Sequence, residues 1–296
     1  MGSMASTLAD NIASVADRTI VITGGNSGIG RAAAGVLAGM DARVVLAVRN
    51  LDKGRAAAET MRGNVDVRRL DLTDLSSVRA FAEEFTDPID ILINNAGIMV
   101  PPLGRTADGF ESQFGTNHLG HFALTNLLLP QIRDRVVTVS SLGHRSGTID
   151  FDDLNWERKP YQPMAAYGQS KLANLLFTSE LQRRLTECSS PVIATAAHPG
   201  LAATNLFGRS GHRVRDAISA AAIGLISQSE QHGALPTLCA ATANIPGNSY
   251  VGPGGFQQTR GEPKLVGRSA EANDAGVARR LWTVSEELTG VGFPQI

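Results

Sequence analysis

Cysteine and long apolar runs are both scarce in this sequence of 296 residues. Its two cysteines, Cys188 and Cys239, lie far apart and outside any metal-ligand spacing, which disfavours a disulfide framework and a zinc site. We interpret both as free thiols in a reducing compartment. After position 200 the longest apolar run covers residues 217–226, far below the roughly 20 residues that a membrane-spanning helix needs. We therefore expect no membrane span.

The sequence also lacks an excess of one charge, because its 27 Lys and Arg residues are balanced by 28 Asp and Glu residues. This balance offers no electrostatic footprint for nucleic acid or an acidic membrane surface. A small neutral or modestly charged ligand fits better. No basic-then-apolar signal sequence follows the start Met1-Gly2-Ser3-Met4. We expect residues 1–14 to be a tag scar with a flexible N-terminus, and the protein to be cytoplasmic.

What the sequence does contain is a repeated alternation of short β-branched runs and helical patterns. Such alternation predicts βαβ units and a parallel sheet. The runs are apolar almost throughout, as expected of strands covered by helices on both faces. We predict one α/β domain over residues 15–296, a Rossmann-type doubly wound parallel sheet, with Asp74 as the N-cap of one helix. The predicted strands are 19–23, 43–48, 65–70, 89–94, 135–140 and 191–197.

Two longer stretches interrupt this pattern, at residues 142–166 and 201–229. Each follows a predicted strand and should lie above the carboxyl ends of the sheet, where open α/β folds bind ligands. We expect residues 201–229 to form a substrate loop. A seventh short strand at about 249–251 leads into Gly252-Pro253-Gly254-Gly255, which we expect to close one side of the pocket.

A glycine-rich turn separates the first predicted strand from the first helix. It reads Thr23-Gly24-Gly25-Asn26-Ser27-Gly28-Ile29-Gly30. Glycines let the backbone turn tightly and approach a pyrophosphate, while the amides and dipole at the helix start hold its charge. A glycine cluster alone is often only a turn, but its place between strand and helix favours a dinucleotide site. The expected cofactor-binding residues here are Gly24, Asn26, Ser27, Gly28, Ile29 and Gly30.

The end of the second strand bears on which dinucleotide binds. Arg49 stands where a site specific for NAD places an Asp or Glu against the ribose hydroxyl. A guanidinium there suits the 2′-phosphate of NADP. The sequence favours NADP(H), while the nearby Asp52 leaves NAD(H) open.

Tyr167 and Lys171 are four residues apart at the start of a helical stretch, which places both on one face. A free tyrosine has a pKa of about 10, and an adjacent ammonium stabilises its phenolate. On a helix, such a pair is usually only a surface contact. The surrounding motifs give it a catalytic interpretation.

Five motifs in order resemble the short-chain dehydrogenase/reductase family over nearly the whole chain. They are the turn at 23–30, Asn94-Asn95-Ala96-Gly97, Ser140-Ser141, Tyr167 with Lys171, and His198-Pro199-Gly200. Within the family, three segments are most similar to the retinol dehydrogenase and protochlorophyllide reductase-like branch. These segments are 94–99, 117–122 and 170–174.

The resemblance implies a role for each matching residue. Tyr167 would be the general acid or base, Lys171 would bind the nicotinamide ribose and lower the tyrosine pKa, and Ser141 would hydrogen-bond the substrate oxygen. Asn117 would hold a water in the proton relay, and Asn95 would stabilise the sheet. Asp71 would contact adenine and Thr204 the nicotinamide carboxamide. Tyr167 would also contact the cofactor. The remaining cofactor contacts would be Leu72, Asn94, Ala96, Gly97, Pro199 and Gly200.

Some positions allow more than one interpretation. Adjacent residues at a strand end point in opposite directions, so Ser140 and Ser141 compete for the catalytic role, and the family pattern favours Ser141. His118 and His121 are interpreted as packing or hydrogen-bonded residues and not as metal ligands, and His144 as a residue that only lines the site. Trp156 and Trp282 are interpreted as packing anchors.

The predicted function is reversible hydride transfer between NADP(H) and a carbonyl or alcohol. The apolar loop, including Leu201, Leu206, Phe207 and residues 217–226, predicts an apolar substrate pocket. The alternative is a catalytically silent NADP(H)-sensing or scaffold protein of the same fold, with a sugar-nucleotide epimerase or dehydratase a distant third. Homo-oligomers are common in the family, but nothing in the pattern specifies an interface, and the fold does not identify a substrate.

Overall fold

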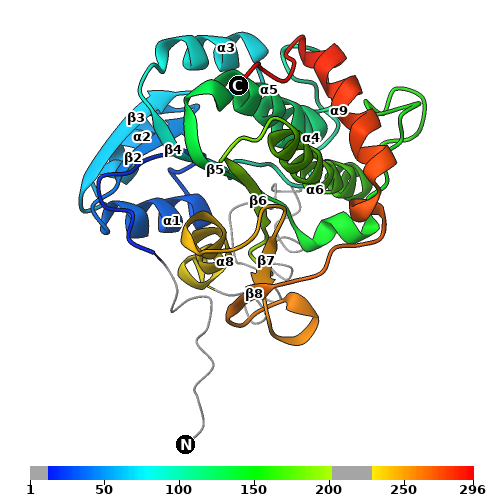
Figure 1. Cartoon of the computed structure of the whole chain (residues 1–296). Coiled ribbons are helices and arrows are strands. Elements are labelled where there is room, and N and C mark those ends of the chain that lie inside the picture. Colours follow the sequence, from blue (N-terminus) through cyan, green and yellow to red (C-terminus); the bar gives the residue numbers. More distant parts are fainter. Residues whose placement is uncertain (1–12, 202–228) are drawn as a thin grey trace, which may run out of the picture.

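A single eight-stranded sheet organises the part of the chain that the computed structural model describes, residues 13–201 and 229–296. The strand order is β3-β2-β1-β4-β5-β6-β7-β8, and each neighbouring pair is parallel except β7 with β8 (Figure 1). The bounds are β1 Thr19–Thr23, β2 Arg43–Val48, β3 Asn64–Arg69, β4 Ile89–Asn94, β5 Ile132–Val139, β6 Ile193–Ala197, β7 Tyr250–Pro253 and β8 Pro263–Leu265. The predicted doubly wound α/β fold is confirmed.

Three strands have the predicted bounds, and the others differ for physical reasons. β1, β2 and β4 are buried at all but one position each, so their apolar runs coincide with the strand bounds. β3 lies at the sheet edge and is partly exposed. Because it carries Asp66, Arg68 and Arg69, this strand is less apolar than predicted. β8, three residues long and antiparallel, was not predicted because it is too short to show a pattern.

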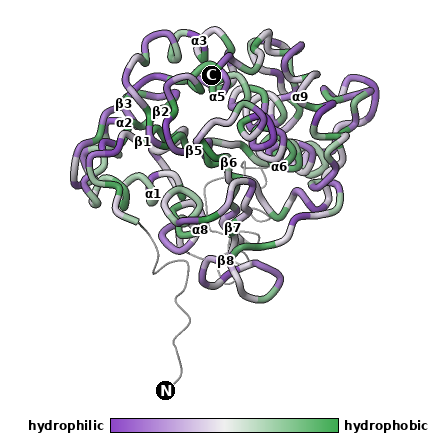
Figure 2. The backbone as a smooth tube through the Cα atoms, viewed as in Figure 1, coloured by the Kyte–Doolittle hydropathy of each residue, from purple (hydrophilic) through white to green (hydrophobic). Residues whose placement is uncertain are grey.

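Helices cover both faces of this sheet. α1 (Gly28–Ala38), α2 (Leu51–Ala58) and α8 (Glu230–Thr242) pack on one face, with one apolar core beneath them. α3 (Leu75–Glu84), α5 (Gly120–Leu128), α6 (Pro163–Glu187) and α9 (Ala275–Thr289) pack on the other, over a second core. Figure 2 shows hydrophobic residues concentrated along the central strands. The predicted N-cap Asp74 begins α3 by accepting from the backbone amides of Ser76 and Ser77.

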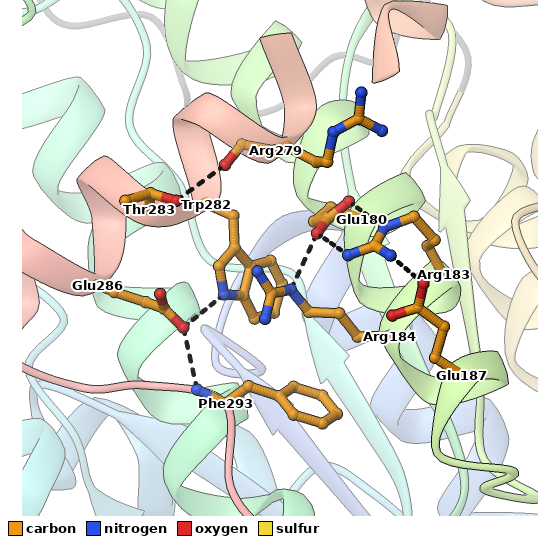
Figure 3. A network of polar contacts seen from close by, with 9 residues as sticks. All are labelled: Glu180, Arg183, Arg184, Glu187, Arg279, Trp282, Thr283, Glu286 and Phe293. Atoms are coloured by element: carbon orange, nitrogen blue, oxygen red, sulfur yellow. Dashed lines mark hydrogen bonds and ion pairs between the residues drawn. The ribbon is translucent and has the colours of Figure 1, made fainter. Parts of the chain in front are cut away.

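The C-terminal helix α9 lies against α6, and a charged and aromatic network joins them (Figure 3). The buried carboxylate of Glu180 accepts from Arg183 and Arg184, and the Arg184 guanidinium lies 4.5 Å from the centre of the Trp282 ring. Trp282 Nε1 donates to Glu286 at 2.7 Å. This confirms Trp282 as a packing anchor and fixes α6 from its outer side.

The strand order reverses between β1 and β4, and this switch point locates the ligand crevice. The glycine turn follows β1, and the loop starting at Asn95 follows β4. Two further segments adjoin the same edge: the short 3-10 helix η4 (Leu142–Ser146) after β5 and the loop after β6. No helix within the described residues is long and apolar enough to cross a membrane.

Candidate active site

The glycine turn leaves the amides at the start of α1 open. Gly24 and Gly28 have positive φ angles of 66° and 56°, which disfavour any side chain. A Cβ on Gly30 would lie 2.3 Å from Asn95 Nδ2, so the turn and the β4 loop pack directly on each other. Ser27 is the N-cap of α1, yet its side chain makes no capping hydrogen bond. The helix start can therefore receive an anionic group.

Thr23, at the end of β1, joins the glycine turn to the β4 loop through the hydrogen bonds of its hydroxyl. Its Oγ1 accepts from the backbone amides of Asn95 and Ala96, each at 2.9 Å. His121 Nε2 lies 2.9 Å from the same oxygen, and His121 Nδ1 lies 3.0 Å from the Asn117 carbonyl. Since that carbonyl only accepts, Nδ1 carries the proton and Nε2 accepts from Thr23.

Asn95 and Asn94, next to each other, serve different parts of the fold. Asn95 Nδ2 donates to the Thr23 carbonyl at 2.8 Å, which ties β4 to β1 where the resemblance expects this residue to stabilise the sheet. The Asn94 amide is buried and donates to Thr125 on α5 at 2.8 Å. Its side chain therefore faces α5 and not the crevice, which leaves only its backbone for the expected cofactor contact.

Asn117 lies in η2 (Gly115–Leu119), a π-helical turn that precedes α5. Such turns recur at functional sites. The side chain of Asn117 pairs with the backbone of Ile98, accepting from its amide at 2.8 Å and donating to its carbonyl at 3.0 Å, and also donates to Ser170. Asn117 thus fixes the β4 loop beside α6, and its expected water contact stays a prediction.

The two adjacent serines are distinguished by their partners. Ser140 is buried, and its hydroxyl donates to the Lys171 carbonyl at 2.8 Å. Ser141 is half-buried, its Oγ accepts from the Gly143 amide at 3.1 Å, and it hydrogen-bonds the Tyr167 side chain. Of the two, Ser141 is the one next to Tyr167.

Tyr167 and Lys171 are both buried on α6, and their environments shift their pKa values in opposite directions. Burial raises the pKa of Tyr167, and the hydrogen bond with Ser141 opposes this. Burial lowers the pKa of Lys171 to about 8. Lys171 Nζ lies 5.9 Å from the centre of the tyrosine ring and donates to the Val139 carbonyl at 3.1 Å. The expected lowering of the tyrosine pKa by Lys171 stays a prediction.

The adenosine end of the crevice contains the other expected residues. Arg49 is exposed immediately after β2, while Asp52 lies on α2 and pairs with Arg55 at 3.2 Å. Asp71, after β3, accepts from the amide and hydroxyl of Thr73. Leu72 is buried against α5, where its carbonyl would lie 2.6 Å from a Cβ on Gly120.

The loop after β6 is described only in part. Gly200 has a positive φ of 71° and packs so closely on Thr259 that a Cβ would lie 2.4 Å from its carbonyl oxygen. Leu201 donates its amide to the same carbonyl at 2.9 Å. The segment after β7 thus lies against Pro199–Leu201 on one side of the crevice. Thr204, Leu206, Phe207 and residues 217–226 lie outside the described residues, so the predicted apolar loop remains a prediction.

Several residues at this site were missed or undervalued from sequence. A Cβ on Gly143 would lie 2.9 Å from the Tyr167 ring, so only glycine lets η4 approach the tyrosine. His121 hydrogen-bonds the Asn117 carbonyl, which confirms its interpretation as a hydrogen-bonded residue but adds a partner that was not predicted, and His144 hydrogen-bonds the Ser141 carbonyl. A local signal existed only for His144, which stands three residues after Ser141.

Comparisons with known proteins identify the family of the chain. The family profile described as short chain dehydrogenase matches residues 18–214. Human retinol dehydrogenase 13 is 42% identical, with 96% of this chain and 88% of the relative covered, and mouse polyprenol dehydrogenase is 39% identical, with 93% and 84% covered. A solved, uncharacterised protein of Mycobacterium paratuberculosis is 53% identical, with a TM-score of 0.83 and 97% and 98% of the two chains covered.

Profile, relatives and fold cover the same elements that carry the serine, tyrosine and lysine. The chain therefore belongs to the short-chain dehydrogenase/reductase family, in its retinol dehydrogenase-like branch, and is an NAD(P)-dependent oxidoreductase of alcohols and carbonyls.

Proposed function

We propose that the protein uses NADP(H) to interconvert an apolar carbonyl compound and its alcohol. The observation that carries this proposal is the convergence of the Ser141 hydroxyl, the Tyr167 phenol and the buried Lys171 ammonium at the carboxyl end of β5. A silent sensing protein has no need for this arrangement. Retinol and polyprenol, named in two relatives, are both apolar isoprenoid alcohols, which supports an apolar substrate.

The residues at the crevice fit a dinucleotide. The uncapped start of α1 suits the pyrophosphate, and Asp71 with Leu72 would adjoin adenine. A Cβ on Gly97 would lie 3.4 Å from Lys171 Nζ, so the bare glycine leaves room beside that ammonium for ribose hydroxyls. When bound, NADPH supplies the hydride to the carbonyl carbon. Thr204 keeps its expected role toward the carboxamide as part of the proposal.

The protein's own groups handle the proton. Because burial raises the pKa of Tyr167, the phenol is protonated near neutral pH and can act as the acid in carbonyl reduction. Ser141 Oγ would donate to the same substrate oxygen, orienting it toward Tyr167 Oη. Lys171 would stabilise the phenolate that remains, and Asn117 holds the β4 loop in place beside it. In alcohol oxidation the proton returns to Tyr167.

A panel of aldehydes tests the substrate class. We expect NADPH-dependent turnover with kcat/KM rising about tenfold or more from short polar aldehydes to isoprenoid aldehydes such as citral and retinal, because each buried CH₂ contributes about 0.8 kcal/mol. The measurement is the loss of NADPH absorbance. A preference for glyceraldehyde over the isoprenoids would contradict the apolar assignment. Tight NADPH binding with no turnover of any aldehyde would favour the silent sensing protein.

The choice of NADP(H) over NAD(H) follows from the end of β2. Arg49 is exposed there and forms no ion pair among the described residues, whereas Asp52 is engaged by Arg55. Replacing Arg49 with alanine should therefore raise the Kd for NADPH by about 10- to 100-fold, the value of one charge-assisted contact. The Kd for NADH should stay within about threefold.

Fluorescence titration of both cofactors gives these constants. The Arg62→Ala variant removes another exposed arginine, beyond α2, and controls for a general loss of positive charge. Equal affinity of the native protein for NADH and NADPH would overturn the assignment.

A further inference from the structure

His144 is fully buried, and both of its ring nitrogens have a backbone partner. Nδ1 lies 2.6 Å from the carbonyl oxygen of Ser141, and Nε2 lies 3.3 Å from the backbone nitrogen of Ser269. A carbonyl only accepts and a backbone amide only donates. Nδ1 must therefore carry the proton and Nε2 must be bare, so one neutral tautomer satisfies both contacts.

The surroundings keep the ring in this neutral form. Burial lowers the pKa of His144, with Arg145 and Arg268 acting in the same direction, while the hydrogen bond to the Ser141 carbonyl and the charge of Glu271 act against them. The Tyr250 ring meets the imidazole edge-on, with 5.7 Å between the ring centres. Protonation of Nε2 would place an N–H against the Ser269 amide, so burial and the Ser269 contact both favour the neutral ring.

Ser141 depends on such contacts because it lies outside regular structure. β5 ends at Val139 and η4 begins at Leu142, so the sheet ladder does not hold Ser141. Its carbonyl accepts from the His144 amide at 3.1 Å as well as from the imidazole, and its Oγ accepts from the Gly143 amide. Through the imidazole, the backbone of Ser141 is also linked to Ser269, in the segment that precedes α9.

We propose that His144 is a positioning residue, which aligns the Ser141 hydroxyl with Tyr167 by tying the Ser141 carbonyl to Ser269. This proposal rests on the proposed function, because it assigns Ser141 a contact with the substrate oxygen. It also departs from the sequence-based interpretation of His144 as a residue that only lines the site.

Two amide variants of His144 test its two hydrogen bonds separately. The amide of asparagine can replace Nδ1 and keep the Ser141 contact, whereas glutamine places its polar group near Nε2 and keeps only the Ser269 contact. We expect His144→Gln to lower kcat at least tenfold with KM and the NADPH Kd little changed, since misplacement of a catalytic group acts on the reacting geometry. His144→Asn should restore kcat to within about threefold of the native enzyme.

If His144 only stabilised the fold, the two variants would have similar kcat values. Each loses one hydrogen bond and part of the ring, so both should lose similar thermal stability. Ser285→Ala removes the buried hydrogen bond between Ser285 and His118, away from the catalytic groups, and should lower Tm while leaving kcat unchanged. Equal kcat values for the asparagine and glutamine variants would overturn the proposal.

Crystal structures of the two variants provide a readout that does not need activity. We expect Ser141 to keep its place in His144→Asn and to move by more than about 0.5 Å in His144→Gln, a shift sufficient to disturb a catalytic geometry. An unmoved Ser141 in both variants would refute the positioning role. If the native protein turns over no carbonyl, the proposed function fails, and the crystal structures still decide the role of His144.

Discussion

Replacing Tyr167 with phenylalanine is expected to lower kcat by about 10²- to 10⁴-fold, the usual contribution of a general acid. Phenylalanine keeps the buried ring on α6 and removes only the hydroxyl that would protonate the substrate oxygen. Because Lys171 and the glycine turn are untouched, the Kd for NADPH should stay within about threefold. Steady-state turnover of the best aldehyde and a cofactor titration measure the two effects.

Tyr161→Phe is the matched control for this experiment. Tyr161 donates its hydroxyl to the buried carboxylate of Glu111 at 2.9 Å, outside the catalytic group. Loss of that contact should cost about 1–3 kcal/mol of stability and leave kcat near the native value. A Tyr167→Phe enzyme that retains more than a tenth of native kcat would remove the phenol from the proposed mechanism.

Replacing Lys171 with methionine should abolish most activity and at the same time stabilise the fold. The ammonium is buried, and burial lowers its pKa from 10.5 to about 8. A group with a depressed basic pKa destabilises the folded state wherever it is charged. Methionine fills similar space without the charge, and we expect a gain of about 1–3 kcal/mol in the free energy of unfolding near pH 7. The Val139 carbonyl keeps the Asn174 amide as a partner at 3.2 Å.

The pH dependence of this gain identifies its cause. Between pH 8 and 10.5 the unfolded chain holds the Lys171 proton more tightly than the folded chain does. As pH rises through this window, the destabilisation of the native protein by the buried Lys171 charge therefore disappears. The difference in unfolding free energy between the native protein and Lys171→Met should shrink toward zero. Denaturant unfolding across the window measures it, with exposed Lys53→Met as the control. A variant less stable than the native protein near pH 7 would show that Lys171 stabilises the fold.

Local patterns predicted the parts of this molecule that depend on neighbours in sequence. The buried strands β1, β2 and β4, the glycine turn, the Asp74 cap and the placement of Tyr167 with Lys171 on one helix face all come from short-range spacing. The ambiguity between Ser140 and Ser141 was stated in advance, since alternation at a strand end shows that the two differ but not which faces the tyrosine.

The features that sequence missed depend on contacts between distant segments or on burial. His144 meets Ser269 across 125 positions, and His121 meets Thr23 across 98. The raised pKa of Tyr167 follows from how deeply α6 is buried, which the Tyr–Lys spacing does not reveal. β8 forms only because the chain turns back after β7, and its three residues carry no pattern of their own.

The contact between His144 and Ser269 also bears on the order in which the protein matures during synthesis. A ribosome completes the glycine turn, Ser141, Tyr167 and Lys171 well before it adds Ser269 and the helix that covers α6. A nascent chain can thus form its nucleotide-binding strands while His144, which contacts the Ser141 carbonyl, still lacks the Ser269 amide as the donor to its Nε2. Under the proposed role of His144, the Ser141 hydroxyl is therefore aligned with Tyr167 only after the segment that contains Ser269 has been made.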